Sequence, residues 1–152
     1  MTLRRKKMQK VLELREQTLH ERAGVLSQAH EGRAIAQEQA TNAAGHLDEA
    51  AQYRQRLATG PINVASWIDA EQWLAHRNHQ NDLAQVQLQG AESLVVTAYD
   101  NVIQARSGVK RIELLDRRMA SEELRRQNRS EQKASDEHSQ RRFTISRRVG
   151  TD

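Results

Sequence analysis

The sequence of 152 residues contains no cysteine, which excludes both a disulfide framework and thiolate chemistry. Aromatic residues make up only 3% of the chain, and there is a single proline, Pro61. A compact core needs bulky side chains that converge from several directions, and so few aromatic residues argue against one. Alanine, glutamine, arginine, glutamate and leucine dominate instead, which is typical of long exposed helices.

The chain also lacks a long apolar run. No stretch approaches the roughly 20 apolar residues that a membrane-spanning helix requires. Residues 1–7 are rich in basic side chains, but no apolar segment follows them, so the pattern does not predict a secretory signal. We therefore expect a soluble, cytoplasmic protein.

Small and aliphatic residues recur at spacings of three and four in two long ladders, one on each side of Pro61. This spacing places each ladder on one face of a helix. Two such faces joined by a short loop predict an all-α fold, a long two-helix antiparallel coiled-coil hairpin without an enclosed pocket. The first ladder consists of Met8, Leu12, Leu19, Leu26, Ala29, Ala36, Ala40, Ala43, Leu47, Ala50 and Leu57. The second consists of Trp67, Ala70, Leu74, Ala84, Leu88, Ala91, Val95, Ala98, Val102, Ala105, Val109, Ile112 and Met119.

The boundaries follow from the residues between the ladders. We expect one coiled-coil domain over residues 1–152, with a first helix over about 3–58 and a turn over 59–65. Gly60 is predicted to adopt the left-handed conformation that ends a helix, with Pro61 just beyond it. Ser66 is predicted to cap a second helix over about 66–142. Residues 121–142 have no partner stretch in this chain, and residues 143–152 are expected to be disordered.

Charge is unevenly distributed along the chain, whose net charge is +4. Residues 1–30 carry seven basic and three acidic side chains, and residues 106–152 carry thirteen and eight. Residues 31–105 carry only four basic side chains and nine acidic ones. Because a hairpin brings its two terminal segments together, we expect one strongly positive end, which matters for partner choice rather than for the fold.

No motif of catalysis or metal binding is present. The sequence has no glycine-rich phosphate loop and no nucleophile elbow, and we expect no enzymatic activity, no cofactor and no small-molecule substrate. His76 and His79 share a helix face with Asp82, but they do not complete a convincing zinc ligand set, so no metal site is predicted. A role in nucleic-acid binding is not favoured either, because the basic residues lack interleaved aromatic residues.

The two tryptophans receive different predictions. Trp67 lies on the second ladder, so we expect it to cap the core next to the turn. Trp73 lies off that ladder, and tryptophans at such positions are enriched at binding hot spots, so we expect it to contact a partner together with Tyr53.

Residues around the turn resemble the FliJ family of the flagellar type III export apparatus. Gly60-Pro61-Ile62, Trp67-Ile68 and Gln72-Trp73 are similar to the family's Gly-Ile, Trp-Ile and Gln-Phe stretch, and Tyr53-Arg54 is similar to a Tyr-Arg before it. Near the end of the chain, residues 129–140 resemble the family's Arg-Leu-Asp-Gln-Lys…Asp-Glu…Gln run. The resemblance covers nearly the whole chain.

This resemblance implies a non-enzymatic stalk and chaperone-escort protein, peripherally associated with the inner membrane through the export apparatus. Its implied partners are the hexameric export ATPase, the cytoplasmic domain of the export gate and export chaperones. Tyr53 and Trp73 match the family's gate-facing surface, and Arg77 stands at another position of it. We assign ATPase binding to the basic open end and a structural role to Gly60, Pro61 and Trp67. The basic residues are Arg4, Arg5, Lys6, Lys7, Arg117, Arg118, Arg125, Arg126 and Arg129.

Two alternatives remain open at this point. The first is an injectisome stalk protein of the YscO-like type, which shares the hairpin. The second is a basic coiled-coil scaffold that binds nucleic acid or an anionic membrane surface.

Overall fold

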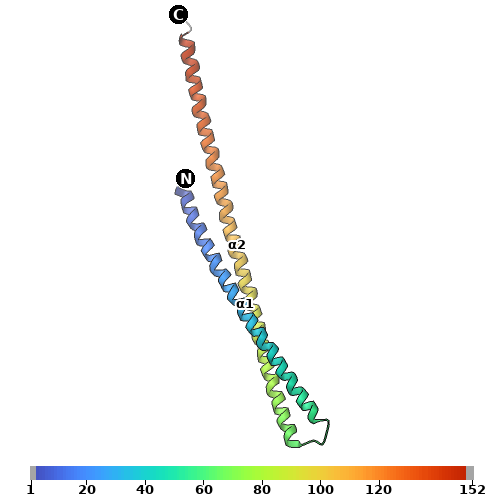
Figure 1. Cartoon of the computed structure of the whole chain (residues 1–152). Coiled ribbons are helices and arrows are strands. Elements are labelled where there is room, and N and C mark those ends of the chain that lie inside the picture. The colour runs from blue at the N-terminus through green and yellow to red at the C-terminus, as the bar shows by residue number, and fades with distance from the viewer. Residues whose placement is uncertain (1–2, 150–152) are drawn as a thin grey trace. The chain divides into compact units, whose positions relative to one another are not determined.

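A computed structural model describes residues 3–149 of the chain, with side chains described as far as Thr144. These residues form two α-helices and no strand: α1 spans Leu3–Leu57 and α2 spans Val64–Val149. The helices pack against each other in opposite directions, as Figure 1 shows on either side of the connection between them. The predicted antiparallel helical hairpin is therefore confirmed.

The chain divides into two compact units, which we describe separately. Unit 1 comprises residues 1–16 and 107–152, so it joins the start of α1 to the second half of α2. Unit 2 comprises residues 17–106 and contains the rest of α1, the connection and the first part of α2. The expectation of one domain over residues 1–152 stays a prediction.

The predicted ladders form the packed seam. Every residue of both ladders is buried or partly buried. In unit 2, Ala36, Ala40, Ala84 and Leu88 form one buried cluster, with Ala43 and Ala91 packed against it. Because alanine has a short side chain, the two backbones can approach closely, although each layer then buries little apolar area.

The end of α1 differs from the prediction. No glycine among the described residues has a positive φ, so Gly60 does not close the helix in the left-handed conformation. Instead, the last turn tightens: the amide N–H groups of Ala58 and Thr59 donate to the carbonyls of Gln55 and Arg56 at 3.2 and 3.3 Å. The Thr59 hydroxyl also donates to the Arg56 carbonyl at 2.7 Å, so this carbonyl at the end of the helix accepts two hydrogen bonds from Thr59.

The start of α2 also differs from the prediction, because Asn63 rather than Ser66 caps the helix. The Asn63 Oδ1 atom accepts hydrogen bonds from the amides of Ala65 and Ser66 at 3.1 and 3.4 Å. The Asn63 carbonyl accepts the first helical bond, from the Trp67 amide at 3.0 Å. An N-cap side chain bonds to the amides two and three positions further along, which are here those of Ala65 and Ser66. Ser66 is therefore the third residue of α2 and not its cap.

The far end of α2 extends past residue 142, where the sequence predicted that the helix ends. Residues 143–149, which were expected to be disordered, are helical, and residues 150–152 lie outside the described residues. From Leu124 to Thr144 every side chain is exposed. Over residues 124–144 the helix therefore continues without burying a face.

Candidate partner-binding surfaces

An aromatic cluster lies in unit 2 near the connection, formed by Tyr53 of α1 with Trp73 and Arg77 of α2. The rings of Tyr53 and Trp73 meet edge to face, with centroids 5.6 Å apart and an interplanar angle of 74°. The Arg77 guanidinium lies 6.0 Å from the centroid of the Trp73 ring. Tyr53 remains 40% exposed, and the two aromatic rings hold each other in place, as such pairs do. The structure thus brings together the three residues that the resemblance assigned to one surface.

Arg77 has a second environment that the sequence did not indicate. The second ladder skips from Leu74 to Ala84, and Arg77 and Asn81 occupy the helical positions between them. Both residues are partly buried, and neither the Arg77 Nε atom nor the Asn81 Oδ1 atom has a hydrogen-bond partner among the described residues. The Arg77 Nη1 atom donates to Gln80 Oε1 at 3.0 Å. The seam is therefore polar beside the aromatic cluster, and weaker there than at its alanine layers.

Trp67 lies on the seam in the first turns of α2 and is partly buried. The guanidinium of Arg54, from α1, lies 5.7 Å from the centroid of its ring and also forms an ion pair with Glu71 at 3.3 Å. Sequence reasoning missed this role of Arg54, although its heptad position opposite the start of α2 could have indicated it. Arg54 of α1 thus holds the start of α2 against the end of α1 through two contacts.

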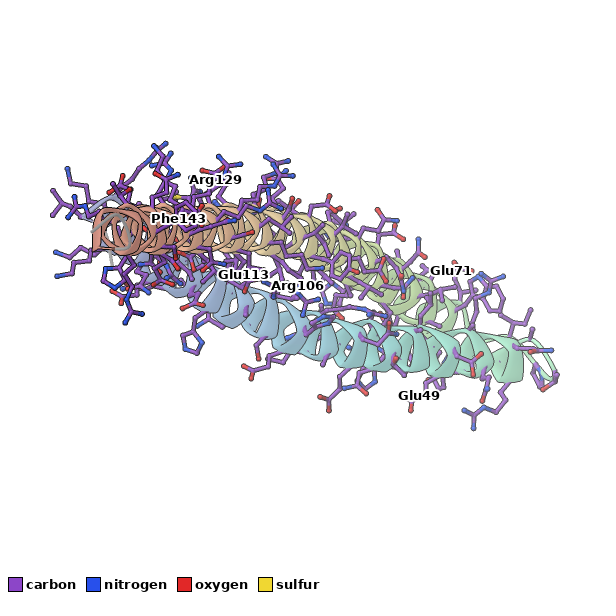
Figure 2. The ribbon with its side chains drawn as sticks, turned by 90° about the horizontal axis from the view of Figure 1, so that it is seen from above. Glu49, Glu71, Arg106, Glu113, Arg129 and Phe143 are labelled. Carbon is purple, nitrogen blue, oxygen red and sulfur yellow. The ribbon has the colours of Figure 1, made fainter. Side chains whose placement is uncertain are left out.

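Among the basic side chains of unit 1 that the structure describes, all but one are exposed. Arg5 is partly buried: its Nε atom lies 3.2 Å from Asp116 and its Nη1 atom lies 3.9 Å from Glu123. Arg5 therefore joins the start of α1 to α2 and is less available to a partner than its neighbours. The other basic residues predicted to bind the ATPase are all exposed, and Arg129 among them is labelled in Figure 2: Arg4, Lys6, Lys7, Arg117, Arg118, Arg125, Arg126 and Arg129.

A depression beside the connection has a volume of about 360 Å³ and is open to solvent. It is lined by Ala51, Arg54, Gln55, Ala58, Trp67 and Leu74. Within residues 3–149, no cluster of three or more histidine, cysteine, aspartate or glutamate side chains could hold a metal ion. Neither helix has a described stretch that is long and apolar enough to cross a membrane.

Comparison with known proteins identifies the family. No curated protein and no solved structure matches the chain significantly. The model of one protein family, described as the flagellar FliJ protein, matches residues 4–148, which is nearly the whole chain. This match confirms the resemblance seen in the residues around the connection. The chain therefore belongs to the FliJ family, whose members are components of the flagellar export apparatus.

Proposed function

We propose that this chain is a non-enzymatic stalk and chaperone-escort protein of the flagellar type III export apparatus. Unit 1 would bind the hexameric export ATPase, and the aromatic cluster of unit 2 would bind the cytoplasmic domain of the export gate or an export chaperone. The observation that carries the proposal is the separation of these features: cationic side chains gather in one unit and the aromatic cluster lies in the other.

The charge of unit 1 supports the assignment to the ATPase. Unit 1 has a net charge of +8 and unit 2 has a net charge of −4, counted over all residues of each unit. Exposed basic side chains attract an acidic surface over a distance of about 10 Å, and this attraction raises the rate at which the two proteins meet. A helix that continues to Val149 with exposed side chains as far as Thr144 presents its basic residues on all sides. Such a segment suits a site that surrounds it, such as the centre of a ring.

The aromatic cluster supports the second assignment. Tyrosine, tryptophan and arginine are the residues most enriched at the hot spots of protein interfaces, because they combine a large contact area with few rotatable bonds. Here the edge-to-face contact orders Tyr53 and Trp73 before any partner arrives, which lowers the entropy cost of binding. Association with these partners would place the protein at the inner membrane peripherally, through the apparatus.

Two variants test the proposal by separating its two halves. A triple variant with Arg125→Glu, Arg126→Glu and Arg129→Glu should lose stimulation of the purified export ATPase while it keeps its affinity for the gate domain. Trp73→Ala should weaken gate or chaperone binding by about tenfold or more and leave ATPase stimulation unchanged. Circular dichroism should show equal helicity in both, since the arginines are exposed and Trp73 is only partly buried.

A matched control is Arg33→Glu, a charge reversal at an exposed position of unit 2. It should change neither activity. If the triple variant stimulates the ATPase normally, unit 1 is not the ATPase-binding part. If Trp73→Ala binds the gate and the chaperones with unchanged affinity, the aromatic cluster does not form that interface.

A further inference from the structure

The first part of α2 carries a second stripe of residues with coiled-coil spacing, separate from the stripe that packs on α1. Its members are all uncharged and all exposed, and Leu83, Val86 and Leu94 are 51%, 64% and 65% exposed. Spacings of three and four residues keep them on one face of the helix. The stripe consists of Leu83, Val86, Gly90, Leu94, Thr97 and Asn101.

A matching stripe lies on α1. Val25, Gln28, Gly32, Ile35 and Gln39 follow the same spacing, and all five are uncharged and exposed. The Arg22 Nη1 atom, one turn before Val25, donates to the carbonyl of Asn101 at 3.2 Å, so the start of this stripe lies level with the end of the stripe on α2. We call the two stripes together the uncharged face of unit 2.

The absence of charge on this face contrasts with a chain in which 29% of residues are charged. Between residues 83 and 101, the only charged residues are Glu92 and Asp100, and both lie off the stripe. The Thr97 hydroxyl donates to the Ser93 carbonyl of its own helix at 3.1 Å, so burial would leave it satisfied. A helix that is apolar on more than the stripe facing its partner is typically covered by a further helix.

Gly90 adds a steric feature to the face. A glycine inside a helix costs about 1 kcal/mol relative to alanine, and contacts within the chain do not account for it here. A Cβ atom built at Gly90 would have no neighbour within 4 Å, and the same holds at Gly32. The glycine therefore leaves a shallow gap between Val86 and Leu94 on an exposed surface.

We propose that the uncharged face binds a second copy of this chain, with α2 packed antiparallel to α2 about a two-fold axis. An interface of this symmetry places the same surface on both sides, so charged residues near the axis would repel their equivalents, and an uncharged face avoids this. When Leu83 lies opposite Leu94 of the second copy, Val86 comes to lie over Gly90 of the second copy. Leu83 and Leu94 then meet at both ends of the interface, and Val86 of each copy fills the gap at Gly90 of the other near its middle. This inference does not rest on the export role.

Sedimentation of the full chain over about 1 to 200 µM tests the proposal, because a small interface should give a concentration-dependent dimer. Val86→Glu, at the centre of the face, should weaken the dimer by more than about tenfold because it would bury a charge. Val96→Glu is the matched control: Val96 is 61% exposed on the same helix but lies off the stripe. It should leave dimerisation unchanged.

Gly90→Leu separates interface effects from folding effects. The side chain would extend into open space in the monomer, so the unfolding midpoint should stay the same or rise, while the dimer should be lost. A chain that stays monomeric across the whole concentration range overturns the proposal, because a second copy then does not bind the uncharged face. A dimer that survives both Val86→Glu and Gly90→Leu, or that Val96→Glu disrupts equally, also overturns it.

Discussion

The two units of this chain contain the same two helices but use them differently. In unit 2, alanine layers such as Ala40, Ala50 and Ala70 are nearly inaccessible, at 2%, 0% and 1% exposed. In the described part of unit 1, only Val109 is buried, at 7% exposed. The charges also differ in sign, at −4 and +8. The comparison indicates that helix packing is concentrated in one unit and cationic surface in the other, so substitutions should separate stability from partner binding.

The largest effect on stability should come from a charge in the seam of unit 2. Ala40 belongs to the buried cluster and is 2% exposed. Ala40→Asp would bury a carboxylate without a partner, and we expect a loss of about 2–4 kcal/mol in the free energy of unfolding. Thermal unfolding followed by circular dichroism measures it.

Ala44→Asp is the matched control, because Ala44 lies one turn further along α1 and is exposed. The intrinsic helix propensity changes equally in both variants, so the difference between them isolates the packing. Equal stability of the two variants would mean that the alanine layers of unit 2 do not hold the helices together.

The next effect should arise at the start of α2, also in unit 2. Asn63→Ala removes the side chain that accepts hydrogen bonds from two amides, and the expected loss is about 1 kcal/mol. Ser66→Ala should have little effect, because the cap does not use its hydroxyl. Urea unfolding of both variants measures the difference in the free energy of unfolding. A larger loss for Ser66→Ala would indicate that Ser66 caps the helix, as the sequence predicted.

The seam was the most predictable part of this fold. All residues of the two ladders are buried or partly buried, because heptad spacing by itself determines which face of a helix is covered. Tyr53 and Trp73 were expected to contact a partner together, and the edge-to-face contact of their rings places them on one surface. Periodicity therefore predicted the two helices and the faces on which they pack.

Local chemistry was less predictable. Asn63 and Ser66 are both good N-cap residues, and the choice depends on how the connection leaves α1, which the sequence does not reveal. Arg77 and Asn81 interrupt the apolar ladder, so the sequence hid their seam positions. The continuation of α2 over residues 143–149 was missed because exposed polar helices carry no hydrophobic period.

A smaller effect is expected for the contact that joins α1 to α2 in unit 1. Arg5→Ala removes the ion pair with Asp116, and because both side chains are partly exposed the loss should be about 0.5–1 kcal/mol. Lys6→Ala, at an exposed neighbouring position, is the control and should change stability by less. Hydrogen exchange at the first turns of α1 should be faster in Arg5→Ala alone, and equal rates in the two variants would show that this ion pair does not anchor the helix.

The smallest effect on the free energy of unfolding should come from a deletion at the end of α2. A chain that ends at Gln127 lacks the part of unit 1 in which the described side chains, as far as Thr144, are all exposed. The removed residues as far as Thr144 bury no apolar face, so the free energy of unfolding should change by less than about 0.5 kcal/mol. An isolated polar helix is marginal in water, so in the full chain the amides of residues 124–144 should also exchange faster than those of residues 84–98. A loss above about 1 kcal/mol on deletion would instead require packing that involves this segment, and the contrast between the units would then fail.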